Sequence, residues 1–139
     1  MSHEGEAGSS RWLDHATSDL EAAAVLLASD VGAGAACFLA QQSVEKALKG
    51  ALVHAGADVP RIHNLDTLRN LLPDGWAAKQ KFPDLAELTA WAIESRYPGD
   101  WPQPSIDDAR TAVDVARAVV ASIADELAAR GLEGSDGEG

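Results

Sequence analysis

The sequence has one cysteine, few aromatic side chains and half as many basic as acidic residues. A lone cysteine, Cys37, cannot form an intramolecular disulfide or supply a cluster of metal-binding thiolates, so a disulfide-stabilised secreted fold has no support. The 139 residues carry 11 Lys and Arg against 22 Asp and Glu, for a formal net charge of -11. Proteins that hold long nucleic acids through their phosphates need the opposite excess, so the composition disfavours that function and leaves room only for a local basic site.

Two kinds of hydrophobic segment are also missing. The first residues are polar and acidic, whereas a secretory signal needs a basic start followed by an apolar run. No stretch reaches the roughly 18 consecutive apolar residues of a membrane span, so we expect a cytoplasmic protein with no membrane contact. Glycine, serine and acidic residues crowd both ends, which predicts disordered acidic tails at 1–9 and 131–139 around one domain at 10–130.

Between the tails, apolar residues recur at steps of three and four, and no segment alternates with period two. This pattern predicts helices and no sheet. Ser10 is a suitable N-cap for the first helix, and Ser105 and Asp108 have the spacing of a capping box before the last one. The expected helices cover 13–27, 37–55, 65–72, 83–96 and 106–127, of which 65–72 is short.

Four long helices predict an all-α fold, an antiparallel up-and-down four-helix bundle with an additional short helix. Alanine dominates the seams of these helices, so a few large side chains must fill much of the core. A protomer this small would also gain stability by forming a homodimer. The large side chains expected in the core are Trp12, Phe38, Trp91, Leu20 and Leu48.

The segment 37–55 combines a broad apolar stripe with a polar opposite side. Glu45 and Lys49 on the polar side have the order and spacing of a weak i,i+4 ion pair. The polar side is made up of Gln41, Gln42, Glu45, Lys46 and Lys49.

Residues 91–104 form an unusual aromatic and charged stretch that three prolines and a glycine force to turn. Arg96 could hold a phosphate or carboxylate while Tyr97 or Trp101 offers a stacking face, as nucleotide binding requires. Alternatively, Arg96 pairs with Glu94 or Asp100, and the aromatic side chains cover the end of the bundle or contact a partner.

A second polar stretch, 60–65, places Arg61, His63 and Asn64 before the short helix. There Asn64 or His63 could cap the helix or contact a ligand.

The remaining motifs of cofactor and metal chemistry are weak. The glycines at 32 and 34 have no preceding strand and no phosphate-binding lysine, so they are better explained as a turn between helices. No two of the four histidines have the one-turn spacing that places both on one helix face. We therefore expect no metal and no cofactor, and we expect Cys37, on the apolar stripe, to act as a small buried hydrophobe.

Three segments together resemble the HEPN domain family (higher eukaryotes and prokaryotes nucleotide-binding). They are AACFLAQQSVEKALKG at 35–50, PRIHNL at 60–65 and ESRYPGD at 94–100, in the order and spacing of that family. The resemblance implies an all-α up-and-down bundle that is commonly dimeric. It also implies a possible minimal nucleotidyltransferase partner, with which many relatives form toxin and antitoxin pairs.

Several HEPN groups are metal-independent ribonucleases marked by an arginine and, after four to six residues, a histidine. Counting from Arg96, the histidine positions hold Trp101, Pro102 and Gln103, none of which exchanges a proton near neutral pH as imidazole does. The resemblance therefore implies a phosphate contact at Arg96 without a catalytic partner, and no catalytic residue is assigned.

Three functions follow from these observations. The first is a non-catalytic dimeric module that binds a nucleotide or a nucleotidyltransferase partner. The second is a ribonuclease toxin with a degenerate site, in which His63 or His54 supplies the imidazole. The third is a structural scaffold without a small ligand. For the first, with RNA a less favoured ligand, the candidate binding residues are Arg96, Tyr97, Asp100, Trp101, Gln42, Lys46, Lys49 and His63.

Overall fold

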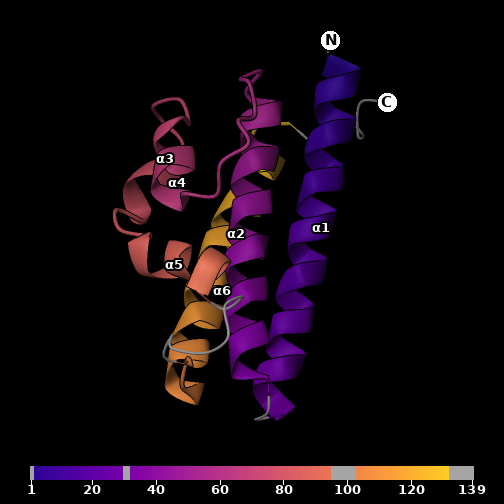
Figure 1. The fold of residues 1–139 in the computed structure, drawn as a ribbon. Coiled ribbons are helices and arrows are strands. Elements are labelled where there is room, and N and C mark those ends of the chain that lie inside the picture. The colour runs from indigo at the N-terminus through magenta and orange to yellow at the C-terminus, as the bar shows by residue number, and fades with distance from the viewer. Residues whose placement is uncertain (1, 30–31, 95–102, 132–139) are drawn as a thin grey trace.

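The computed structural model describes residues 2–29, 32–94 and 103–131, and within these ranges it contains six helices and no strand. Three helices are long and lie side by side (Figure 1): α1 (Ser2–Ser29), α2 (Ala33–His54) and α6 (Ile106–Ala129). In Figure 1, α2 and α6 run in the same direction and α1 runs opposite to them. The predicted all-helical bundle is confirmed, and no described helix is long and apolar enough to cross a membrane.

Three shorter helices form the fourth side of the bundle and lie on the opposite side of α2 from α1 (Figure 1). They are α3 (Leu65–Asn70), α4 (Ala77–Lys81) and α5 (Ala86–Glu94). The sequence predicted one short helix and a four-turn helix from Pro83, whereas α4 was not predicted and α5 begins only at Ala86. Proline has no backbone N–H, and here the side chain of Asp84 accepts from the Ala86 N–H at 3.0 Å, so the chain turns before the helix begins.

The helix α4 is fixed by contacts with the end of α6 rather than by its own sequence. Its first N–H, on Ala77, donates to Glu126 Oε1 at 2.7 Å, and Arg130 binds the other oxygen of Glu126 at 2.9 Å. The Arg130 guanidinium also lies 4.5 Å from the centre of the Trp76 ring. A five-residue helix is too short to be stable alone, so these contacts with α6 account for it.

The core lies along α2, which contacts α1, α3, α5 and α6. Leu48 is buried as expected, whereas the other large side chains named from the sequence are only half-buried. The largest fully buried side chain is instead Trp76, 2% exposed, which follows a turn at Gly75 with φ of 99°. The stripe of α2 predicted from its spacing is wholly buried: Cys37, Ala40, Val44, Ala47 and Ala51.

The helices α1 and α2 approach each other closely at Gly50. A Cβ atom at this position would lie 2.9 Å from Trp12 Cβ and 3.3 Å from the backbone oxygen of Ser9. Ser9 is buried, and its hydroxyl donates to the Gly50 carbonyl at 2.9 Å. The helix begins at Ser2, before the predicted cap at Ser10, and its contacts with α2 already include Gly8 and Ser9.

The start of α6 follows the sequence prediction in detail. Ser105 Oγ accepts from the Asp108 N–H, and Asp108 Oδ2 accepts from the Ser105 N–H, both at 3.0 Å. The predicted capping box is thereby confirmed. The domain boundaries remain predictions, and residues 132–139 lie outside the described part of the chain.

Candidate functional site

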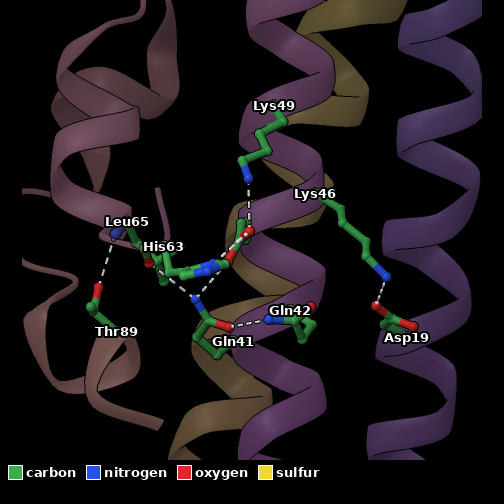
Figure 2. Close-up of polar contacts among 9 residues, drawn as sticks. Asp19, Gln41, Gln42, Lys46, Lys49, His63, Leu65 and Thr89 are labelled. Atoms are coloured by element: carbon green, nitrogen blue, oxygen red, sulfur yellow. Dashed lines mark hydrogen bonds and ion pairs between the residues drawn. The ribbon is translucent and has the colours of Figure 1, made fainter. Parts of the chain in front are cut away.

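The candidate site is centred on the carboxylate of Glu45, on a polar face of α2 that the rest of the chain covers. Glu45 is 6% exposed and Lys49, one turn later, is 7% exposed. Lys49 Nζ lies 2.9 Å from Glu45 Oε2, so the predicted i,i+4 pair is present. It is a buried pair rather than a weak surface pair, because the segment before α3 lies against this face of α2 (Figure 2).

His63 reaches the same carboxylate from the segment before α3. Its Nδ1 atom lies 3.0 Å and 3.1 Å from the two oxygens of Glu45. An ionised carboxylate only accepts hydrogen bonds, so Nδ1 carries the proton in this arrangement. The His63 side chain is 63% exposed, and its Nε2 atom has no hydrogen-bond partner among the described residues. The site thus presents an imidazole of fixed orientation at the surface.

Two glutamines extend this network along α2. Gln41 Nε2 donates to Glu45 Oε1 at 3.1 Å and to the backbone oxygen of His63 at 3.2 Å. Gln42 Nε2 in turn donates to Gln41 Oε1 at 2.8 Å. No buried side-chain nitrogen or oxygen in the described part of the chain lacks a partner, so the buried part of the network is satisfied.

Two further hydrogen bonds fix the backbone next to His63. Asn64 is the N-cap of α3, and its side chain accepts from the Thr67 N–H at 3.0 Å. The Leu65 N–H donates to Thr89 Oγ1 of α5 at 2.9 Å (Figure 2). The capping role expected at this helix therefore belongs to Asn64, which leaves the His63 side chain to Glu45.

The surroundings of Glu45 keep it ionised. Burial alone would raise the pKa of Glu45, but hydrogen bonds from Lys49, His63 and Gln41 have the opposite effect. As a result, the pKa of Glu45 lies below its ordinary value of 4.5. The carboxylate is therefore negative at neutral pH and lies between two potential cations. This makes it an acceptor that orients His63, rather than a proton donor.

Two of the predicted site residues, His63 and Lys49, contact the Glu45 carboxylate, and a third, Gln42, reaches it only through Gln41. Lys46 lies on another side of α2 and extends toward α1, where its Nζ atom contacts Asp19 Oδ2 at 2.7 Å (Figure 2). It does not join the network. Four other predicted site residues lie outside the described ranges: Arg96, Tyr97, Asp100 and Trp101.

Sequence reasoning did not place Glu45 or Gln41 in the site. Both were recognised as polar residues of one helix face, but their contacts with His63 span 18 and 22 positions. No local pattern shows that a distant segment lies against that face. The only sequence signal is the polar face itself on a helix expected to be largely buried.

Among the described residues, the remaining candidates for chemistry show no catalytic geometry. Burial, with smaller contributions from Asp108 and Glu87, raises the pKa of the Cys37 thiol to about 12, so it is no nucleophile at neutral pH. The described residues contain no group of three or more His, Cys, Asp or Glu side chains placed to hold a metal ion. A small cleft of about 70 Å³ between α5 and α6 carries three acids, Asp84, Glu87 and Asp108, and would repel phosphates.

Comparisons with known proteins found one family model and a similar solved structure. The sequence model of the HEPN domain matches residues 9–127. Among solved structures, the crystal structure of TT1696 from Thermus thermophilus is similar, with a TM-score of 0.76 and 28% sequence identity. That similarity covers 86% of this chain and 98% of TT1696. No curated protein matches the chain at a significant level.

Proposed function

The chain belongs to the HEPN domain family, and from this premise we propose that it is a non-catalytic dimeric module. It binds a nucleotide or a minimal nucleotidyltransferase partner, in the manner of a toxin and antitoxin pair. The observation that carries the proposal is the exposed His63 imidazole held by the buried carboxylate of Glu45. Its position is fixed before binding, so little conformational entropy is lost when a partner contacts it.

The Glu45 network supports recognition in a second way. Lys49 and Gln41, which are both buried, donate hydrogen bonds to the Glu45 carboxylate. The carboxylate therefore needs no ligand to satisfy it. What is left for a ligand or a partner is Nε2 of His63, which accepts a hydrogen bond when the ring is neutral and donates one when it is charged. Such a group can meet a phosphate, a base edge or a backbone carbonyl.

The experiment is co-purification from the native host with a tagged full-length chain. We expect a minimal nucleotidyltransferase to be recovered with the wild-type protein and lost with His63→Ala. The matched control is His54→Ala, a half-buried histidine whose ring contacts Trp76 edge-on. Recovery of the same enzyme with both variants places the interface elsewhere, and recovery of none with the wild type contradicts the partner role.

The dimer has a separate test. Many of the buried residues of the long helices are alanine, and each alanine has little apolar area to bury, which favours association with a second copy. Sedimentation at micromolar concentration is expected to give a dimer. A strict monomer at that concentration contradicts this part of the proposal.

One observation favours a second function, metal-independent RNA cleavage. A histidine whose Nδ1 donates to a buried carboxylate and whose Nε2 is exposed has the arrangement that an acid–base catalyst requires. Incubation of total RNA with the protein in EDTA distinguishes the two functions. Cleavage that is lost in His63→Ala establishes the enzyme, and intact RNA supports the binding module.

A further inference from the structure

A cleft of about 480 Å³ lies between α1 and α2, on a different side of α2 from the Glu45 network. Its lining comes from four residues of α1 and one of α2: Gly8, Arg11, Trp12, His15 and Lys46. The α1 residues follow one another at helical spacing, so they lie on one face of that helix. From Gly8 to His15 this face is about 10 Å long, at a rise of about 1.5 Å per residue.

The charge of this cleft is opposite to that of the whole chain. Its titratable lining residues, Arg11, His15 and Lys46, are all basic, although the chain carries a net charge of -11. Arg11 and His15 are exposed and make no ion pair or hydrogen bond with any described residue. A carboxylate can therefore reach both of them without displacing a described partner.

Lys46 is held in position at one end of the cleft. Its Nζ atom contacts Asp19 Oδ2 at 2.7 Å (Figure 2), and its side chain is 28% exposed. An ammonium group has three donors, and Asp19 takes one of them. The pair therefore fixes the direction of Lys46 without using up its capacity to bind a second carboxylate.

Trp12 adds an apolar surface next to these basic residues. Its Cβ atom lies against Gly50 of α2, where no side chain intervenes, and its side chain is half-buried. An indole ring offers a large apolar area together with one N–H donor. The cleft thus fits a segment that carries carboxylates and at least one apolar side chain.

Residues 132–139 of this chain have that composition. Their sequence is LEGSDGEG, with three acids, no base and one large apolar side chain. Glu133 and Asp136 are three positions apart, which corresponds to about 10 Å of extended chain. The basic face of α1 along the cleft has the same length. The glycines between the acids let the backbone adapt to a groove.

The end of α6 lies at the same end of the bundle as the first turns of α1, because α6 runs opposite to α1 (Figure 1). The two helices also contact each other. The eight residues 132–139 span about 28 Å when fully extended, whereas a helix with its side chains is about 10 to 12 Å across. The segment is therefore long enough to pass around α1 and reach the cleft.

We propose that the acidic segment 132–139 occupies this cleft in the same chain. Its carboxylates pair with the basic lining residues, and Leu132 contacts the indole ring of Trp12. Exposed ion pairs are individually weak, but a segment attached by a short flexible linker has an effective concentration in the millimolar range. The covalent attachment lets several weak pairs act together, and the occupied cleft is closed to other anions.

This inference goes beyond the function proposed above, because no residue of the Glu45 network lines the cleft. The smaller cleft between α5 and α6 does not compete for the segment. Its charged lining residues are all acidic, so it would repel the carboxylates.

The experiment attaches a nitroxide spin label to the full-length chain at Ser135→Cys and records NMR spectra. The label should react there alone, because the other thiol, Cys37, is fully buried. We expect the backbone signals of Arg11 and His15 and the indole N–H signal of Trp12 to lose intensity. In about 1 M salt, where the Debye length falls to about 3 Å, these signals should recover.

Two pairs of substitutions test the charges. Glu133→Gln with Asp136→Asn removes them from the segment, and Arg11→Gln with His15→Gln removes them from the cleft. Each pair should restore the indole signal. The matched control is Arg117→Gln, which removes the charge of an exposed arginine on α6 that does not line the cleft. It should leave the loss of the indole signal unchanged.

Several results would overturn the proposal. One is an indole signal of Trp12 that keeps its intensity. Another is an equal loss at Trp12 and at the backbone of Arg117, which shows that the segment has no preferred site. A loss that persists in about 1 M salt or in both charge-neutral pairs shows that the contact does not depend on charge.

A mixed sample distinguishes the same chain from a second copy. It combines an isotope-labelled chain without the spin label and a spin-labelled chain without the isotope. Full intensity of the Trp12 signal in this mixture supports the contact within one chain. A loss as strong as in the single sample shows that the segment reaches a second copy, which overturns it.

His63→Ala separates this inference from the proposed function. The substitution should leave the loss of the Trp12 signal unchanged, because His63 does not line the cleft. Co-purification of a nucleotidyltransferase through His63 is a different measurement, so either result can fail while the other holds.

Discussion

Nδ1 of His63 lies 3.0 Å and 3.1 Å from the two carboxylate oxygens of Glu45, although the two residues belong to different parts of the fold. Through this contact, a buried acid of α2 sets the position of the segment that leads into α3. Lys49 holds the same carboxylate from within α2. The free energy of the bundle and the orientation of its exposed imidazole therefore depend on one side chain.

Removing Glu45 should destabilise the fold because it leaves the Lys49 ammonium buried without a partner. We expect Glu45→Ala to lower the free energy of unfolding by about 3 kcal/mol. Replacing both residues by methionine should cost less than Glu45→Ala alone, since no buried charge remains. Urea denaturation measures both. As a control, Asp114→Ala breaks an exposed pair with Arg117 and should cost less than about 0.5 kcal/mol.

Stability should depend on pH on the acid side. The pKa of Glu45 is below 4.5, and so is that of Glu126, held there first by the Ala77 N–H and then by Arg130. A carboxyl whose pKa is lower in the folded state contributes its full stability above about pH 4.5, and loses it as pH falls through the folded value. The urea midpoint should therefore decline below about pH 4.5, and the decline should be shallower in Glu126→Gln. A midpoint that rises on acidification contradicts this assignment.

Gly50 is required for the close approach of α1 and α2. An alanine is a better helix former than glycine by about 1 kcal/mol, but its Cβ would lie 2.9 Å from Trp12 Cβ, an atom next to the backbone that cannot move aside. We expect Gly50→Ala to destabilise the protein by about 2 kcal/mol. Gly34→Ala, in the same helix, meets no atom closer than 3.8 Å and should be neutral or stabilising. Thermal unfolding of the two variants tests the difference, and equal effects would rule out the steric explanation.

Cys37 should be unreactive in the folded protein. It is fully buried, and burial, followed by the charges of Asp108 and Glu87, raises the pKa of its thiol to about 12. A thiol reagent should therefore modify it only as fast as the protein unfolds, and raising the pH to about 9 should add little thiolate. In denaturant, one thiol per chain should react at once. Rapid modification without denaturant would show that this part of the core opens readily.

The helices with a strong internal pattern could be predicted from the sequence, and the contacts between distant segments could not. The capping box at Ser105 and the stripe of α2 are local, because a few residues determine them. In contrast, α4 follows Pro73 and Gly75 and precedes Pro83, residues that indicate a break in a helix. Its N-cap, Trp76, makes no side-chain capping hydrogen bond, so α4 depends on Glu126, 49 positions after Ala77 in the chain.

The candidate site divides in the same way. His63, Lys49 and Gln42 were named from the sequence; His63 and Lys49 do contact one carboxylate, and Gln42 joins the same network through Gln41. Glu45 was seen only as half of a helical ion pair. Its role as the centre of the network depends on His63, which is 18 residues later in the chain and packs back against α2. The spacing of residues within α2 cannot predict this contact.

The side of the bundle formed by the three short helices should be less stable locally than the sides formed by α1, α2 and α6. Helices of six, five and nine residues are each below the roughly 12 residues at which an isolated helix becomes even marginally stable. Their order depends on tertiary contacts such as Arg69 with the backbone oxygen of Phe82, and Asp66 with the Leu85 N–H. This side is therefore the cooperative unit that should exchange its amide hydrogens first, while α1, α2 and α6 remain protected. A partner that docks here would meet the part of the fold that adjusts its shape at the lowest free-energy cost.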